Sequence, residues 1–285
     1  MKQVFRTAII AGLCLLLAGC LVRIAYSQAD WLIAREINQY VSLDDEQSAF
    51  LDERLDAHLD WHCAREVPRY QAWFADLANQ ARAGELNARD VEASFDRAEQ
   101  FLRRLAERIA PDAVELLATL SDEQVTELLD HLDEQQRQRR EQYADPDAAT
   151  RRAERVERME ERLERWYGRL NREQRARVEQ WGEELAASPD AWLENRERWR
   201  EALATALEHR DDPAAFRDRV KPLLTEPETL WDPEYAESVR HARTQAVELI
   251  VDVHELASER RQLRAARKLE TWQSNMGRIA CEESA

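Results

Sequence analysis

A five-residue pattern that begins with leucine and ends with Glu-Gln occurs three times, as LDDEQ at 43–47, LSDEQ at 120–124 and LNREQ at 170–174. Its second residue is Asp, Ser or Asn, and the side-chain oxygen of each can accept hydrogen bonds from the free amides of a first helical turn. The Gln three residues later can bond back to the amide of that capping residue, while the leucine packs as a hydrophobic staple. The pattern therefore predicts three helix starts.

The rest of the chain also favours helices. It has only six glycines, no Asn-Gly or Asp-Gly hairpin pair, and no run of alternating apolar and polar residues. Asp or Ser before Pro at 145–146, 188–189, 212–213 and 232–233 predicts further helix starts. The expected helices cover 23–40, 45–83 with a kink at Pro68, 87 to just before Pro111, 121–143, 147–167, 171–187, 189–210, 213–224 and 233–276.

These helices predict an all-α fold, an elongated multi-helix bundle with long helices. Within 147–167 an apolar stripe recurs every three or four residues, which is typical of a helix with one face in a core; it comprises Ala153, Val156, Met159, Leu163 and Trp166. Most of the nine tryptophans, Trp166 and Trp199 among them, are expected in the core. One extended core and two sub-bundles that share long helices are both compatible with this length.

The first twenty residues have the layout of a bacterial lipoprotein signal. Two positive charges in MKQVFR precede the apolar run TAIIAGLCLLLA, and LAGC at 17–20 fits a lipobox. We expect residues 1–19 to be cleaved and Cys20 to carry the lipid, which leaves 20–285 as a helical periplasmic domain. The alternative is an ordinary signal peptide that happens to end in Cys. Leu21, where an Asp would indicate inner-membrane retention, favours the outer membrane, with inner-membrane retention as the alternative.

The charge balance restricts the partners. The chain has a formal net charge of −16, which disfavours nucleic acid, so the membrane contact is expected through the lipid anchor alone. G-x-S-x-G, P-loop and G-x-G-x-x-G patterns are absent from the sequence. The sequence therefore predicts no cofactor and no enzymatic activity.

Cys63 and Cys281 are the two cysteines that remain after signal cleavage and lipidation. An even count in an oxidising compartment predicts a disulfide between them. Such a bond would tie an early helix to the end of the chain. Two separate buried thiols are the alternative.

The segment HLDWHCAREVPRY at 58–70 is the densest candidate site. His58, His62 and Glu66 are spaced by four, so they follow one side of a helix and are weak candidates for metal ligands. The Glu that serves as general base in H-E-x-x-H enzymes is missing, because Leu59 follows His58, and no metal is predicted. Hydrogen-bonded histidines at a helix boundary are the simpler interpretation. Trp61 and His62 are instead candidates for partner binding.

The lipobox, AYSQADWLIAREINQYVSLDDEQ, WHCAREVPRY and RLERWYGRLNREQRARVEQWGEEL together resemble an uncharacterised family of Gram-negative lipoproteins, known only as a domain of unknown function. The resemblance covers essentially the whole chain and implies no activity. More loosely, the three Leu-x-x-x-Gln units resemble the LTxxQ motif of Spy-like periplasmic chaperones, small α-helical proteins that bind unfolded clients or sense envelope stress. Here Asp44, Ser121 and Asn171 replace the Thr.

The sequence supports three hypotheses about function. The first is a lipid-anchored helical protein that binds other envelope proteins, in a chaperone-like or stress-related role, and it predicts an accessible apolar or aromatic groove. The second is a structural adaptor with one dedicated envelope partner. The third, less favoured, is a metal-dependent enzyme centred on His58, His62 and Glu66, and it requires a further strong ligand nearby.

Overall fold

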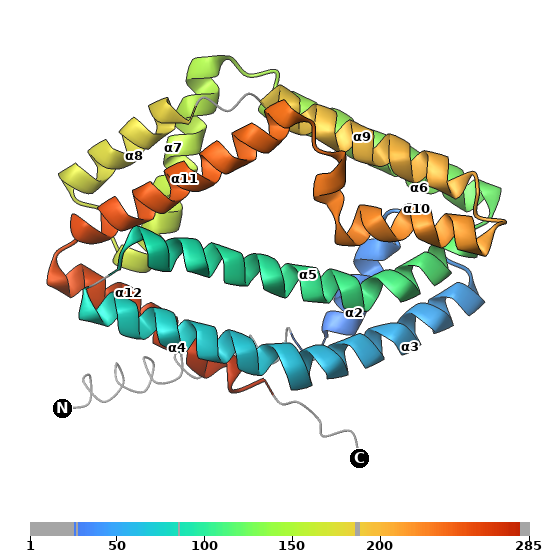
Figure 1. The fold of residues 1–285 in the computed structure, drawn as a ribbon, viewed down its shortest axis with the longest axis horizontal. Coiled ribbons are helices and arrows are strands. Elements are labelled where there is room, and N and C mark those ends of the chain that lie inside the picture. The colour runs from blue at the N-terminus through green and yellow to red at the C-terminus, as the bar shows by residue number, and fades with distance from the viewer. Residues whose placement is uncertain (1–25, 27, 85, 186–188, 280–285) are drawn as a thin grey trace, which may run out of the picture.

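The structure is a computed structural model that describes residue 26 and residues 28–84, 86–185 and 189–279. Within those residues every regular element is a helix (Figure 1). The predicted signal peptide 1–19, the lipidation site Cys20 and Cys281 lie outside the described residues. None of the described helices is long and apolar enough to span a bilayer.

The elements, in chain order, are α2 (Ala29–Ile37), α3 (Asp45–Trp61), the π-helix η1 (His62–Glu66), α4 (Val67–Ala83), α5 (Ala88–Ala118), α6 (Asp122–Tyr143), α7 (Ala148–Tyr167), α8 (Arg172–Glu184), α9 (Pro189–Leu207), α10 (Pro213–Thr225), the 3-10 helix η2 (Pro227–Leu230), α11 (Pro233–Glu255) and α12 (Glu259–Met276). The predicted all-α bundle with long helices is confirmed.

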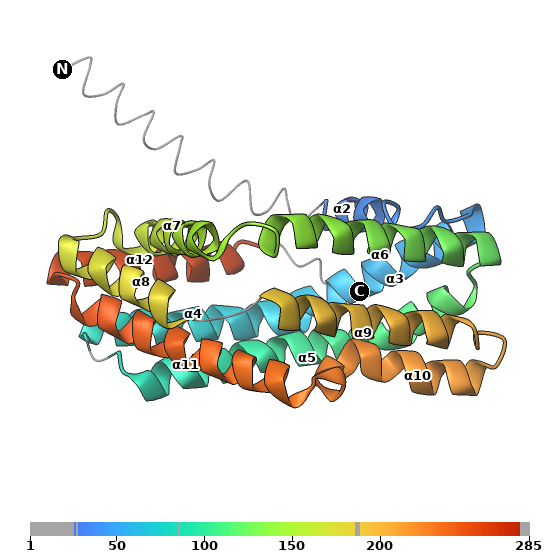
Figure 2. The ribbon, with the colours of Figure 1, turned by 90° about the horizontal axis from the view of Figure 1, so that it is seen from above.

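The molecule is elongated and consists of two sub-bundles (Figures 1 and 2). One is built around α6, α9 and α10, and the other around α7, α8 and α11. The long helix α5 contacts α10 of the first and α11 of the second, and α12 packs along α4. Of the two arrangements compatible with the sequence, the chain therefore adopts the one in which sub-bundles share long helices.

Each sub-bundle has its own apolar core. The first core comprises Val41, Val114, Leu120, Leu128, Leu203, Ala206, Leu207, Phe216, Val220 and Leu223. The second comprises Leu163, Tyr167, Leu170, Val178, Trp181, Leu185, Leu249, Val253, Ala257 and Ala265. The predicted stripe of α7 supplies Leu163 to the second core, with Val156, Met159 and Trp166 packed against it. Trp199 packs on the first core, and its indole N–H donates to the carbonyl oxygen of Leu223 at 2.9 Å.

All three predicted helix starts are present as complete capping boxes. Asp44, Ser121 and Asn171 each accept a hydrogen bond from the amide three residues on, and the Gln at that position accepts from the amide of the cap. The staple leucines behave as expected: Leu120 and Leu170 are buried, and Leu43 packs against the first core.

The glutamines of the capping boxes also connect helices. The side-chain amides of Gln47 and Gln124 bond to each other in both directions, at 3.0 and 2.6 Å from nitrogen to oxygen, which joins the start of α3 to the start of α6. Gln174 is fully buried, and its amide donates to the carbonyl oxygen of Val253 in α11 at 2.9 Å. The repeated pattern therefore starts helices and also fixes where they meet other elements.

The predicted kink at Pro68 takes the form of a π-helix that ends just before it. The amide of Val67 bonds to the carbonyl of His62, five residues back. Pro68 then stands in the first turn of α4. α3 and α4 meet at an angle at this point (Figure 1).

Two predicted boundaries were wrong. α5 was expected to end before Pro111, but it continues to Ala118. Ala110 and Val114, on either side of Pro111, are both buried. Their packing against other helices therefore outweighs the cost of a proline inside a helix, which is about 3 kcal/mol. The expected single helix over 233–276 is divided into α11 and α12 at Leu256–Ser258. This break lets α12 return along α4 and pack on α7.

Candidate functional site

An apolar groove of about 410 Å³ lies between α2, α3 and α5. Its walls are almost entirely hydrocarbon, and its main apolar residues are Ile33, Ile37, Phe50, Leu51, Leu55, Leu59, Leu105, Ile109, Ala113 and Leu116. The polar residues that line it are Tyr26, Arg54, His58, His62 and Asp112. Both histidines singled out from the sequence therefore lie in the wall of one groove.

His58 forms one polar point of the groove. Its Nε2 atom lies 2.9 Å from the Oδ2 atom of Asp112 on α5, and the Nε atom of Arg54 lies 3.8 Å from the other oxygen of that carboxylate. Burial lowers the pKa of His58 below its usual value, and the negative charge of Asp112 opposes part of that shift. Asp112 thus anchors α3 to α5 from the groove wall.

His62 lies between two tyrosines. Its Nδ1 atom is 3.1 Å from the hydroxyl of Tyr26, and its Nε2 atom is 3.3 Å from the hydroxyl of Tyr70. The Tyr26 hydroxyl also donates to the carbonyl oxygen of Leu59 at 3.1 Å, so the network assigns the proton of neutral His62 to Nδ1 and leaves Nε2 to accept from Tyr70.

Burial changes the acid–base behaviour of this cluster. It lowers the pKa of His62 and raises the pKa of Tyr26 to about 12, to which the negative charge of Asp60 contributes. A neutral imidazole and protonated phenols are thus the favoured forms near neutral pH. The cluster acts as a hydrogen-bonded brace between the segment before α2 and the π-helix.

Glu66 faces α5. It is 1% exposed, and its Oε1 and Oε2 atoms accept from Nε and Nη2 of Arg104 at 3.1 and 2.9 Å. Arg69 donates to the same carboxylate at 3.1 Å. These bonds satisfy a charge that would otherwise be costly to bury. They also leave Glu66 engaged with two guanidinium groups.

The three weak metal candidates therefore have separate partners: His58 contacts Asp112, His62 contacts the tyrosines, and Glu66 binds the arginines. Within the part of the chain that the structure describes, no group of three or more His, Cys, Asp or Glu side chains is placed to hold a metal ion. The further ligand that the metal-enzyme hypothesis requires is not found among those residues.

The remaining candidates lie close to the groove. Trp61 is half-buried. Cys63 is 4% exposed and packs with Val67 and Ile279 in a small third core. Ile279 lies two residues before Cys281 in the sequence. The predicted disulfide remains a prediction, because Cys281 is outside the described residues.

Several residues of the site were missed by sequence reasoning. Asp112 and Arg104 belong to α5, far along the chain from the residues that they contact, and nothing local signals the pairing. Trp31 on α2, with 55% of its surface accessible, is more exposed than the half-buried Trp61. An apolar WLI run at 31–33 within an otherwise charged helix is the signal that could have pointed to it.

Comparison with known proteins places the chain in a family. Residues 39–236 match a family described as "Family of unknown function (DUF6279)". The chain belongs to this family. The match includes His58, His62, Glu66 and all three capping boxes, so the expected membership in a domain family of unknown function is confirmed. No curated protein and no solved structure matches the chain.

Proposed function

We propose that this member of the DUF6279 family is a lipid-anchored protein of the outer membrane that faces the periplasm and binds other envelope proteins through the groove between α2, α3 and α5. The lipobox that ends at Cys20 supports the anchor and the compartment. The groove supports the binding role, and it is the observation that carries the proposal.

The groove is bordered by apolar side chains that water reaches. Ile33 on α2 and Ile109 on α5 line the groove and are 40 and 37% exposed. Trp31 and Leu32, on α2 but outside the lining of the groove, are 55 and 46% exposed. A solvent-accessible apolar cluster beside a preformed groove is typical of a protein-interaction surface. On a body with a formal net charge of −16, such a cluster is a local exception.

The chemistry of the groove defines the partner segment. A volume of about 410 Å³ with hydrocarbon walls fits two or three large apolar side chains of one face of an amphipathic helix. The acidic body favours basic residues on the flanks of that segment through electrostatic complementarity. The occupant we propose is therefore an amphipathic segment of an envelope protein with an apolar face and basic flanks.

Two modes of use are compatible with this groove. A chaperone-like protein would accept many such segments, because apolar contacts carry little sequence specificity. An adaptor would hold one dedicated partner, for which a single defined groove suffices. Both predict the same contact surface, and they differ in the number of partners.

Site-specific photo-crosslinking in cells tests the proposal. A photoreactive phenylalanine analogue replaces Ile109, which lines the groove, or Leu102, which is 67% exposed on the same helix outside it. We expect adducts from position 109 only, with crosslinked peptides that carry apolar residues between basic ones. Many adducts indicate the chaperone-like mode, and one adduct indicates the adaptor. Equal labelling from both positions, or none from 109, would contradict the proposal.

A Cys20→Ser form tests the anchor separately. We expect it to lose the lipid, measured as a change in intact mass, and to leave the membrane fraction. A variant that stays in the membrane fraction with unchanged mass would remove the lipoprotein part of the proposal. The groove part would remain open to the crosslinking test.

A further inference from the structure

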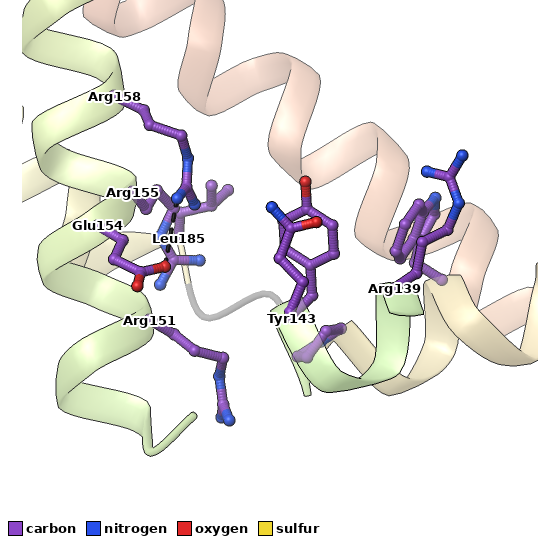
Figure 3. A pocket seen from close by; sticks show the side chains of 10 residues that line it. Arg139, Tyr143, Arg151, Glu154, Arg155, Arg158 and Leu185 are labelled. Carbon is purple, nitrogen blue, oxygen red and sulfur yellow. Dashed lines mark hydrogen bonds and ion pairs between the residues drawn. The ribbon is translucent and has the colours of Figure 1, made fainter. Parts of the chain in front are cut away.

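A second pocket, of about 390 Å³, lies between the end of α6, the face of α7 and the start of α9 (Figure 3). Four arginines line it, Arg139, Arg151, Arg155 and Arg158, and Glu154 is the one acidic residue in its lining. The overall chain is acidic, with a formal net charge of −16. The lining of the pocket is therefore positively charged, whereas the chain as a whole is negatively charged.

The α7 arginines share one face of the helix, because their spacings are four and three residues. Figure 3 shows Arg155 and Arg158 extending from α7 toward the side of the pocket that holds Tyr143. Arg158 pairs with Glu154 at 3.3 Å, and Arg151 donates to the carbonyl oxygen of Ala144 at 3.0 Å.

The charge of Arg155 has no ion-pair partner among the described residues. Its Nε atom is buried and has no hydrogen-bond partner among the described residues. Burial and the positive charges of Arg151 and Arg158 lower the pKa of Arg155, although an arginine stays protonated in a protein. A positive charge held in this way is stabilised by an anion that enters the pocket.

The opposite wall joins further positive charge to aromatic surface. The guanidinium carbon of Arg139 lies 5.9 Å from the centroid of the Trp192 ring, and that of Arg196 lies 5.5 Å from it. Burial and the charge of Arg139 lower the pKa of Arg196. Tyr143 meets Trp192 edge to face, with centroids 5.6 Å apart. Of these residues Arg139, Tyr143 and Trp192 line the pocket, and they offer a ligand a cation and a flat apolar contact.

Several arginines outside the pocket pair with acids. Arg243 contacts three carboxylates, those of Glu92, Asp96 and Glu99. Arg152, the neighbour of the pocket residues on α7, turns away from them and pairs with Glu183 at 3.1 Å. Since the chain carries an excess of acids, a lining of four arginines and one glutamate departs from its general pattern.

We propose that this pocket binds an organic phosphate. Guanidinium groups match the oxygens of a phosphoryl group with paired N–H donors, and a dianion balances more than one of the pocket arginines. The apolar or aromatic part of the ligand lies against Trp192 and Tyr143. The volume of about 390 Å³ fits a small molecule or a lipid headgroup.

Titration calorimetry of the full chain with phenyl phosphate at low salt tests the proposal. We expect saturable binding, weakened at least about tenfold by Arg155→Gln, because a charge-assisted contact is lost. Arg152→Gln removes the same charge from the same helix outside the pocket, and we expect it to bind within about twofold of the wild type. Absence of saturable binding, or equal loss in the two variants, would overturn the proposal.

A vesicle flotation assay identifies the source of the phosphate. The same three proteins, each carrying Cys20→Ser so that no lipid anchor inserts into the bilayer, are mixed with phosphatidylcholine vesicles containing phosphatidic acid and with phosphatidylcholine vesicles alone. Arg155-dependent flotation with phosphatidic acid assigns the pocket to a lipid phosphate. Arg155-dependent binding of phenyl phosphate without flotation assigns it to a soluble phosphate ester. If Arg155→Gln weakens neither the binding of phenyl phosphate nor the flotation with phosphatidic acid, the site is refuted.

Discussion

The side chain of Gln174 completes a helix cap and also connects two helices. It is fully buried, accepts from the amide of Asn171 at 3.0 Å and donates to the carbonyl oxygen of Val253 at 2.9 Å. The first bond completes a helix cap, and the second fixes α8 to α11. Without this amide, the buried carbonyl of Val253 and the partly buried amide of Asn171 lose a hydrogen-bond partner.

We therefore expect Gln174→Ala to lower the free energy of unfolding by about 1 to 3 kcal/mol, the usual cost of leaving buried polar groups unsatisfied. Gln180→Ala is the matched control on α8, since Gln180 is exposed and bonds only Glu184. Its effect should stay within about 0.5 kcal/mol. Urea unfolding of both variants measures the difference, and equal midpoints would refute the structural role of Gln174.

The buried histidines predict loss of stability in mild acid. Burial lowers the pKa of His254, and also those of His58 and His62, below the value of about 6.5 that applies to the unfolded chain. Below that pH the unfolded chain binds more protons than the folded one, so the free energy of unfolding falls as pH falls. The stability that these groups contribute is complete above about pH 6.5 and declines below it.

Urea unfolding at about pH 7.5 and about pH 5.5 measures this dependence. His254 lies in the second sub-bundle, with its Nδ1 atom 3.1 Å from the Tyr167 hydroxyl, and His254→Gln should make the decline shallower. His209→Gln is the control, because His209 is exposed. A decline that is the same in wild type and His254→Gln would contradict the assignment.

At the scale of elements, the capping boxes of α3 and α6 stabilise each other. Gln47 and Gln124 exchange two hydrogen bonds while each completes its own cap. Removing either side chain breaks the same pair. We expect Gln47→Ala and Gln124→Ala to be non-additive in a double-mutant cycle, with a coupling of about 0.5 to 3 kcal/mol.

The control cycle combines Gln47→Ala with Gln174→Ala, which belong to different sub-bundles and share no partner. Their effects should add to within about 0.5 kcal/mol. Unfolding free energies of the single and double variants give both couplings. Additivity of Gln47 with Gln124 would show that the reciprocal pair contributes nothing beyond the separate caps.

The π-helix is held by a buried ion pair. Glu66→Ala leaves Arg104 and Arg69 without their shared carboxylate. We expect a loss of about 3 kcal/mol, the low end for breaking a buried pair, because both guanidinium groups are partly solvated. Glu53→Ala, at an exposed carboxylate 3.8 Å from Arg54, should cost less than about 1 kcal/mol. Similar unfolding midpoints for the two variants would contradict this reading of the π-helix.

At the scale of the whole molecule, α12 and Ile279, the last described residue, lie against the early helices. Ile279 packs with Cys63 and Val67, and α12 lies along α4. We expect a disulfide between Cys63 and Cys281, seen as a linked peptide pair in a non-reducing digest. Its reduction should lower the free energy of unfolding by up to about 5 kcal/mol, since it closes most of the chain into a loop. Alkylation of Cys63 before reduction would refute the bond.

Sequence reasoning succeeded where the governing contacts are local. The caps at Asp44, Ser121 and Asn171 and the stripe of α7 were predictable, because their partners lie within one or two helical turns. It failed at Pro111 and at Leu256–Ser258. There, burial against distant helices decided whether the helix continued.

The candidate site also combines features that local spacing predicted with contacts that only the tertiary structure reveals. The spacing of His58 and His62 predicted a shared helix side, and both line the groove. Their partners Asp112 and Tyr26 lie on other parts of the chain, and no local pattern points to them. The arginine pocket was not predicted: the spacing of the α7 arginines puts them on one helix face, but only tertiary packing places Trp192 in the same pocket.

The sequence alone therefore determined the helical class and the helix starts, because a capping box closes its hydrogen bonds within three residues. The tertiary structure determined which helices contact one another and which grooves and pockets they form. The pairing of Gln47 with Gln124 spans 77 residues, and that of Gln174 with Val253 spans 79. The groove and the arginine pocket likewise exist only where separate helices meet, and contacts of that kind depend on the packing of the whole chain rather than on any segment of it.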